Sequence, residues 1–257
     1  MTQKFFKDKG IILKRVNIGE ADKILTIFTE HHGKIQTKAK GIRWIKSKFA
    51  GHLELFTYAR LSLVEGKSLY IITESEGIES FQNIRRSLKK TYLTYYFSDL
   101  VSHLSASDDV NSELFSLFLE VLRQLHSSNF NRKLSLLRQF FEVKALYLSG
   151  FPVQVYDCAS CGRKLEPSKN YFSNKLGGVV CYKCKSEDKL SYGLQDEVVK
   201  LLRILQVKDF NFLKRLKVSQ KTAKETSRVI KNFLRFVLEK DLDSSLFLER
   251  KELAFIL

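Results

Sequence analysis

Short runs of apolar and β-branched residues fill the first third of the chain, and several of them alternate with polar residues in a period of two. Glycine-containing segments separate these runs and are typical of turns. Five short strands in about seventy residues favour a small closed barrel, of which the OB-fold is the commonest nucleic-acid-binding version, although an SH3-like barrel has a similar pattern. The expected strands are residues 11–16, 23–28, 34–40, 53–63 and 69–73.

After Phe81, apolar residues recur at every third or fourth position, which predicts amphipathic helices. The expected helices are residues 83–104, 112–125, 134–148, 193–207 and 221–238, with a short helix near Asn211. The apolar segment 246–257 is expected to dock rather than trail. The chain is therefore predicted to be an α+β protein, in which an N-terminal OB-fold-like β-barrel precedes an α-helical domain. The expected boundaries are 1–81 for the barrel, 82–157 and 191–257 for the two helical parts, and 158–190 for an insertion.

The insertion holds all four cysteines of the chain. Cys158 and Cys161 form one C-x-x-C pair, and Cys181 and Cys184 form a second. Two such pairs at this spacing are typical of a structural Zn²⁺ site, because the metal takes four thiolates in a tetrahedron. Disulfides or a redox pair are the alternatives, but nothing else in the chain indicates an oxidising compartment. We expect one structural zinc ion and a four-cysteine zinc finger.

Net charge narrows the class of partner. The 257 residues suffice for two domains, and they carry a formal net charge of +16. Such an excess favours nucleic acid as the partner, ahead of an acidic membrane or an acidic protein. The chain shows no secretory signal and no run of eighteen apolar residues, so we expect a cytoplasmic protein without a membrane-spanning helix.

The placement of the cations is more informative than their number. Residues 31–53 contain no Asp or Glu, and the polar positions of the strand 34–40 share one parity, so they project from one face. Lysines neutralise phosphates, and an aromatic ring such as Trp44 can stack on an unpaired base for about 1–3 kcal/mol. The alternative is a solvated basic face with Trp44 in the core. The candidate DNA contacts here are Lys34, Lys38, Lys40, Arg43, Trp44, Lys46 and Lys48.

Two further basic tracts lie in the helical regions. Cations at the start of the helix expected from Asn83 oppose the helix dipole, which hints at a role beyond stability. These weaker candidates for DNA contact are Arg85, Arg86, Lys89 and Lys90. Residues 214–231 form the second tract, which we interpret as a solvated helix face, with a helix-turn-helix as the alternative.

No arrangement of residues indicates catalysis. The five histidines of the chain form no metal-binding motif of a protease, and no serine-hydrolase signature is present. We therefore expect a protein that is not an enzyme.

With these segments read, the chain resembles the RecO family of bacterial recombination mediators. The resemblance covers about residues 9–184. Where the family has Pro before the barrel's aromatic, this chain has Leu55, and some family members lack the cysteines. The matching segments are 19–29 (GEADKILTIFT), 33–41 (GKIQTKAKG), 46–51 (KSKFAG), 69–81 (LYIITESEGIESF), 148–152 (LSGFP) and 171–181 up to Cys181.

The resemblance implies a non-enzymatic DNA repair and homologous recombination protein. Such proteins bind single- and double-stranded DNA, anneal complementary strands, and with RecR help to load RecA on strands coated by single-strand-binding protein. Further partners implied are the tail of single-strand-binding protein and RecF, and the implied location is the cytoplasm at the nucleoid.

Two other classes stay open. A zinc-dependent, sequence-specific transcription or translation regulator would use the tract 214–231 and would prefer one duplex sequence over competitor DNA. An interaction scaffold would grip acidic protein tails, and its binding would survive removal of nucleic acid.

Overall fold

The computed structural model describes residues 5–49, 51–127, 130, 133–167 and 169–245. The chain divides into two compact units, residues 1–128 (unit 1) and 129–257 (unit 2), and each is described by itself. The segment 246–257, which was expected to dock, lies outside the described residues. The domain boundaries proposed from the sequence stay predictions.

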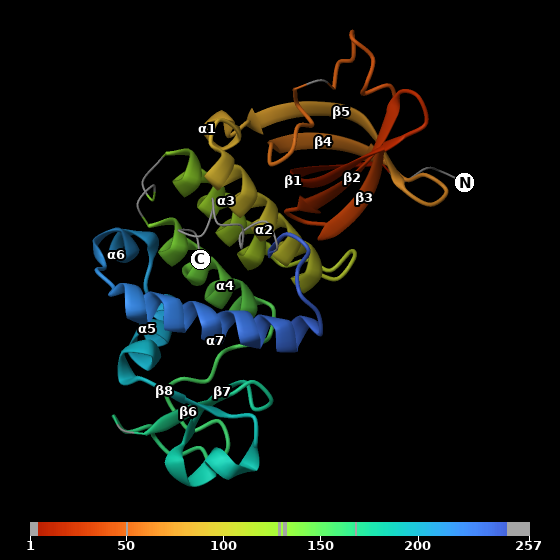
Figure 1. The fold of residues 1–257 in the computed structure, drawn as a ribbon. Coiled ribbons are helices and arrows are strands. Elements are labelled where there is room, and N and C mark those ends of the chain that lie inside the picture. Colours follow the sequence, from red (N-terminus) through yellow and green to blue (C-terminus); the bar gives the residue numbers. More distant parts are fainter. Residues whose placement is uncertain (1–4, 50, 128–129, 131–132, 168, 246–257) are drawn as a thin grey trace. The chain divides into compact units, whose positions relative to one another are not determined.

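Five strands close into a barrel in unit 1 (Figure 1). They are β1 (Phe5–Ile18), β2 (Asp22–Thr29), β3 (Lys34–Ala39), β4 (Tyr58–Val64) and β5 (Tyr70–Glu79). Their order around the barrel is β1-β2-β3-β5-β4, and β4 pairs again with β1. Only the β3–β5 pair is parallel, whereas the other neighbours are antiparallel. This arrangement confirms the OB-fold-like barrel expected from the sequence.

Two strand boundaries differ from the prediction. The strand expected over 53–63 begins only at Tyr58, because the chain turns at Phe56, whose φ is 68° and whose N–H donates to the Ile12 carbonyl at 2.9 Å. β5 extends beyond residue 73 to Glu79, since β4 pairs with it along its whole length. Pairing with a distant strand, which local pattern does not reveal, sets both boundaries.

The barrel core explains the unbroken apolar run at the centre of β1. Ile12 packs inside with Leu25, Ile27 and other core residues. Ile11 next to it is also fully buried, because the outer face of this part of the barrel is covered by helices. Burial on both faces suits a continuous apolar run rather than strict alternation.

Unit 1 also contains α1 (Gln82–Arg85), α2 (Leu88–Leu104) and α3 (Ser112–His126). The single helix expected over 83–104 is therefore wrong: the chain breaks at Ser87, which is extended (φ −124°, ψ 112°). The Ile84 carbonyl accepts the Ser87 N–H at 3.0 Å and also the Thr91 hydroxyl, from the first turn of α2, at 2.9 Å, which links the two helices across the break.

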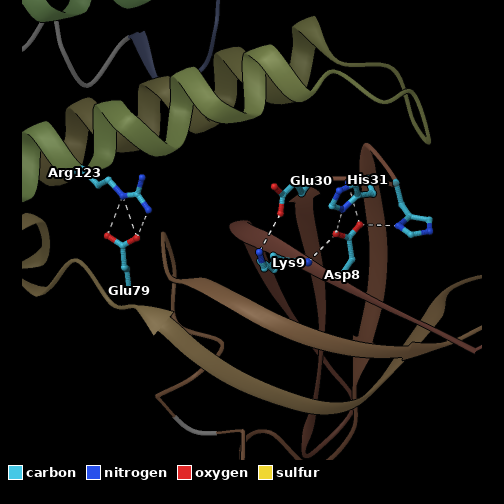
Figure 2. Close-up of polar contacts among 7 residues, drawn as sticks. Asp8, Lys9, Glu30, His31, Glu79 and Arg123 are labelled. Atoms are coloured by element: carbon cyan, nitrogen blue, oxygen red, sulfur yellow. Dashed lines mark hydrogen bonds and ion pairs between the residues drawn. The ribbon is translucent and has the colours of Figure 1, made fainter.

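The expected helix 112–125 is confirmed as α3. It begins where the Asn111 side chain accepts a hydrogen bond from the Leu114 N–H at 2.9 Å, as a helix cap does. Near its other end, Arg123 binds both carboxylate oxygens of Glu79 at the end of β5, with Nη2 and Oε1 2.6 Å apart (Figure 2). This two-pronged pair fixes α3 to the barrel.

Unit 2 combines helices with a small sheet. The helix predicted over 134–148 is confirmed, but the one expected from residue 193 begins at Asp196, since 192–194 pair with β6 as a strand. No helix among the described residues is long and apolar enough to cross a membrane. The elements are α4 (Leu134–Leu148), β6 (Asn170–Ser173), β7 (Gly178–Cys181), the 3₁₀ helix η1 (Tyr182–Glu187), β8 (Tyr192–Leu194), α5 (Asp196–Val207), α6 (Phe210–Arg215) and α7 (Gln220–Leu238).

Candidate nucleic-acid interface and cysteine cluster

The parity expected for β3 is what the structure has. Ile35, Thr37 and Ala39 are buried inside the barrel, whereas the residues between them turn outward. The outward face of β3 is not uniformly available, however, because its lysines differ in what they contact.

Lys34 is bound within the protein rather than offered to solvent. Its ammonium donates to the carbonyl oxygens of Ser102 and Ser105 at the C-terminal end of α2, the second at 2.7 Å. A cation is favoured at this end of a helix, and burial lowers the pKa of Lys34. This side chain joins the barrel to α2, and the DNA contact at Lys34 stays a prediction.

Lys38 helps to fix the loop that follows β3. Its ammonium lies 2.9 Å from one carboxylate oxygen of Asp22, at the start of β2, and the other oxygen accepts the Gly41 N–H at 2.8 Å. These two contacts lower the pKa of Asp22, the backbone hydrogen bond more than the lysine. Arg43 adds a second tie, since its backbone N–H donates to the Ala21 carbonyl at 2.9 Å. The start of the loop is thereby held to the β1–β2 turn.

Residues 40–48 form what we call the basic loop, and most of their side chains reach solvent, whereas Ile42 is buried in the barrel core. Trp44 is 69% exposed and Ile45 fully exposed, so the alternative of a core tryptophan is wrong. The indole lies against Gly41, where an added Cβ would come within 2.8 Å of it, and the φ of 64° at Gly41 also suits glycine. The ring therefore touches the backbone at Gly41 and keeps most of its surface in solvent. The exposed cations of the basic loop are Lys40, Arg43, Lys46 and Lys48.

The cations after Phe81 do not form one surface. Lys90 is 6% exposed, its ammonium donates to the Leu125 carbonyl at 2.6 Å, and burial lowers its pKa. We therefore correct this predicted DNA contact to a structural tie between α2 and α3. Arg85 is exposed and donates to the Leu55 carbonyl at 3.1 Å, while Arg86 and Lys89 are exposed.

A polar cluster beside the barrel was not foreseen. The Asp8 carboxylate is buried, and it lies 3.0 Å from His31 Nδ1 and 2.6 Å from His32 Nδ1 (Figure 2). The backbone N–H groups of Lys9 and His31 also donate to it. Burial alone would raise the pKa of Asp8, but the hydrogen bonds from His32 and His31 outweigh it and lower the pKa. Separation by 23 residues left no local signal for this contact.

The four cysteines come together in unit 2, as their spacing predicted. One sulfur from each lies within 4.8 Å of all the others, and Cys161 Sγ and Cys181 Sγ are 4.0 Å apart. Tetrahedral coordination with Zn–S bonds of about 2.3 Å requires sulfurs about 3.8 Å apart. The donor set and spacing therefore fit a Zn²⁺ ion, and all four cysteines are free of disulfides.

The surroundings favour a thiolate at Cys161, whereas burial and the contacts with the other three cysteines raise the pKa of Cys184 to about 12. Arg163 Nε donates to Cys161 Sγ at 3.4 Å, and this contact lowers the pKa of Cys161 to about 6. The backbone N–H of Cys181 donates to Cys158 Sγ at 3.3 Å. Backbone and guanidinium donors of this kind are the outer contacts that hold metal ligands in place. β7 holds the second pair beside the first, since the Ala159 N–H donates to the Val179 carbonyl at 2.9 Å. The small sheet that β7 forms with β6 was not predicted from the sequence.

Comparison with known proteins gives one consistent result. The family described as "Recombination protein O N terminal" matches residues 1–81, and "Recombination protein O C terminal" matches residues 85–246. A protein named DNA repair protein RecO from Dehalococcoides mccartyi (strain CBDB1) is 37% identical over 249 residues, which cover 97% of each chain. The RecO protein of Roseiflexus sp. (strain RS-1) is 34% identical over 97% of this chain and 87% of its own. That of Caldanaerobacter subterraneus is 32% identical over 95% and 97%.

Proposed function

The chain belongs to the RecO family of DNA repair proteins, and from this premise we propose that it binds single- and double-stranded DNA through the basic loop and anneals complementary strands. Membership of the family supports a role in DNA repair and recombination. The observation that carries the finer proposal is the supported, solvent-facing Trp44 among exposed cations.

The loop has the two features that binding to an unpaired strand requires. Its cations can neutralise phosphates, with release of counterions, and the exposed ring of Trp44 can stack on any base. Neither interaction selects a sequence, because every base has a flat face and every nucleotide a phosphate. A strand held in this way stays free to slide while it searches for the register of its complement.

The chain's own cysteines are proposed to hold one structural Zn²⁺, which would order the segment 158–190. Cys158, Cys161, Cys181 and Cys184 would be the ligands, with Arg163 oriented on Cys161 as an outer contact. With four thiolates the coordination would be complete, so no position is left for a substrate. The metal's contribution would be to folding.

Family membership also supports the proposed partners. We propose that the protein acts without catalysing a reaction, and that with RecR it helps to load RecA on strands coated by single-strand-binding protein. RecF and the tail of single-strand-binding protein stay further predicted partners, and a location in the cytoplasm at the nucleoid stays a prediction.

The experiment that tests the DNA proposal is annealing of two complementary oligonucleotides followed by fluorescence transfer. The variant Lys40→Ala/Lys46→Ala/Lys48→Ala removes three exposed cations of the basic loop and leaves the Lys38–Asp22 tie intact. If each contacts one phosphate, the slope of log affinity for a single strand against log salt becomes shallower by about 2. Annealing by the variant slows in parallel.

A matched control removes the same charge elsewhere in unit 1. Lys7, Lys14 and Lys67 are exposed and lie outside the loop, so Lys7→Ala/Lys14→Ala/Lys67→Ala should anneal like the wild type. An equal loss of annealing in both triple variants would mean that the effect depends on net charge and not on the position of the lysines. A wild type that does not anneal, or that strongly prefers one duplex sequence, would contradict the proposal and favour the transcription regulator.

A further inference from the structure

α7 carries a line of cations along one side. Within Gln220–Leu238 there is one acidic residue, Glu225, against five basic ones. Spacings of three, four, three and four residues separate the cations, so at about 100° per residue they fall within a stripe about 80° wide. The five residues, here called the α7 stripe, are Lys221, Lys224, Arg228, Lys231 and Arg235.

The α7 stripe faces away from the interior of unit 2. The buried residues of α7, such as Val229, Ile230 and Phe233, lie on the side of the helix opposite to it. Lys221, Lys224, Arg228 and Arg235 are exposed. The stripe therefore lies on the surface of unit 2, whereas the basic loop belongs to unit 1.

Two acidic groups pair with cations of the stripe, one with Arg228 and one with Arg235. Glu225 lies 3.8 Å from Arg228, and Asp241 binds Arg235 through both oxygens at 2.8 Å. Within the described part of the chain, Lys221 and Lys224 have no ion-pair partner. An arginine–aromatic contact also steadies the stripe, since the Arg228 guanidinium lies 5.7 Å from the centre of the Tyr192 ring.

The dimensions suit a phosphate backbone. Fourteen residues of α-helix span about 21 Å, and a DNA strand in a duplex places a phosphate about every 3.4 Å along the axis. A row of evenly spaced cations of this length can therefore contact several successive phosphates. The row itself contains no aromatic residue, which leaves charge as its means of recognition.

We propose that the α7 stripe binds the phosphate backbone of a second DNA strand. The inference rests on the function proposed above, because annealing requires one protein to hold two strands that repel each other. The basic loop of unit 1 takes one strand and the α7 stripe of unit 2 takes the other. An even row of cations matches the regular charge of nucleic acid better than the irregular charge of an acidic protein tail.

Stoichiometry tests this directly. The probe is a single-stranded oligonucleotide of about 12 nucleotides that cannot pair with itself, titrated at low salt by calorimetry. The full-length wild type should bind two oligonucleotides. Lys221→Glu/Lys224→Glu should bind one, and so should the triple variant of the basic loop, because each removes a different site. The control Lys189→Glu/Lys200→Glu changes two exposed lysines of unit 2 outside α7 by the same charge and should still bind two.

The outcomes separate this inference from the proposed function. The stripe would not be a DNA site if the α7 variant still bound two oligonucleotides. The same would follow if the wild type bound only one and the loop variant bound none. Either result would leave the basic loop as the DNA site. No binding by the wild type would overturn both. A glutamate peptide of equal length serves as the acidic competitor. If the wild type bound this peptide more tightly than the oligonucleotide, and the α7 variant did not bind it, the stripe would be a site for an acidic protein instead. Circular dichroism confirms that each variant is folded.

Discussion

Trp44 and Phe49 lie five residues apart in one basic segment, yet only Trp44 reaches solvent. Phe49 is 6% exposed and belongs to the barrel core, while the Trp44 ring rests on Gly41 with most of its surface in solvent. Both residues are aromatic and flanked by cations, so composition does not separate them. The turn that follows β3 decides which ring packs and which one is presented.

We expect Trp44→Ala to weaken binding of a single strand by about 1–3 kcal/mol, the contribution of one base stacked on an aromatic ring. Trp44→Phe should recover part of this loss. Fluorescence anisotropy of a labelled oligonucleotide measures the affinity, and quenching of the only tryptophan in the chain reports the contact itself.

Ile45→Ala is the matched control for Trp44, because this neighbour is fully exposed and has no ring. It should bind the oligonucleotide like the wild type. Equal losses at the two positions would mean that the loop contributes apolar surface, without stacking.

The lysines also differ in whether they reach solvent or bind within the protein. The sequence places Lys34 and Lys90 among the candidate surface cations, but each donates to carbonyl oxygens at the end of a helix. The exposed end of a helix offers unpaired carbonyls that attract any long cation within reach. Which lysine is within reach depends on how helices and strands pack.

At the scale of elements, Asp8 connects β1 to the turn between β2 and β3. Its carboxylate accepts hydrogen bonds from two backbone N–H groups and contacts His31 and His32, while Lys9 and Glu30 lie beside it (Figure 2). A buried carboxylate is stable only with such partners. We infer that the cluster holds the turn in place.

We expect Asp8→Asn to lower the free energy of unfolding by about 2 kcal/mol at neutral pH, since an amide nitrogen would face donors where the carboxylate accepted them. The pKa of Asp8 is lowered in the folded state from its ordinary 3.8, so its contribution is present above that pH and is lost as pH falls through the lowered pKa. Urea unfolding at about pH 7 and about pH 3 should therefore show a difference that shrinks in acid.

Glu20→Gln serves as the control for Asp8→Asn, because Glu20 is exposed in the β1–β2 turn. It should change the free energy of unfolding little at either pH. A difference between Asp8→Asn and the wild type that stays constant in acid would rule out the carboxylate's charge as the cause.

At the scale of the whole molecule, the two units carry different candidate sites. Unit 1 holds the barrel and the basic loop, whereas unit 2 holds the cysteine cluster and the α7 stripe. The exposed cations of the basic loop and those of the α7 stripe therefore belong to different units. A protein that handles two strands gains from such a division.

Removal of the metal should loosen the cysteine segment of unit 2 and leave the barrel of unit 1 unchanged. We expect the purified protein to contain one zinc ion, and a strong chelator should raise hydrogen exchange at the backbone of β6 and β7, because these strands carry or adjoin the second cysteine pair. Exchange in the strands β1–β5 should not change. Mass spectrometry of peptides reports both regions in one experiment.

Absence of zinc from protein purified without chelator would contradict the metal prediction. Equal increases in exchange in both units would contradict a role confined to the cysteine segment.

The sequence by itself determined the elements whose signals are local. The alternating runs gave the barrel, the periodic runs gave α3 and α4, and the cysteine spacing predicted the cluster that the structure brings together. Each of these signals depends on residues within a few positions of one another, or on the fixed geometry of a four-sulfur set.

Only the tertiary structure decided the features that depend on contacts between residues far apart in the sequence. Pairing with β4 set the length of β5, the extended backbone at Ser87 separates α1 from α2, and Asp8 contacts His31 and His32 just beyond the end of the neighbouring strand β2. It also placed the Lys34 ammonium against carbonyl oxygens of α2 and left Trp44 exposed. A side chain's charge and shape are written in the sequence, but whether they meet water, backbone or another side chain is fixed by the packing of elements far apart along the chain.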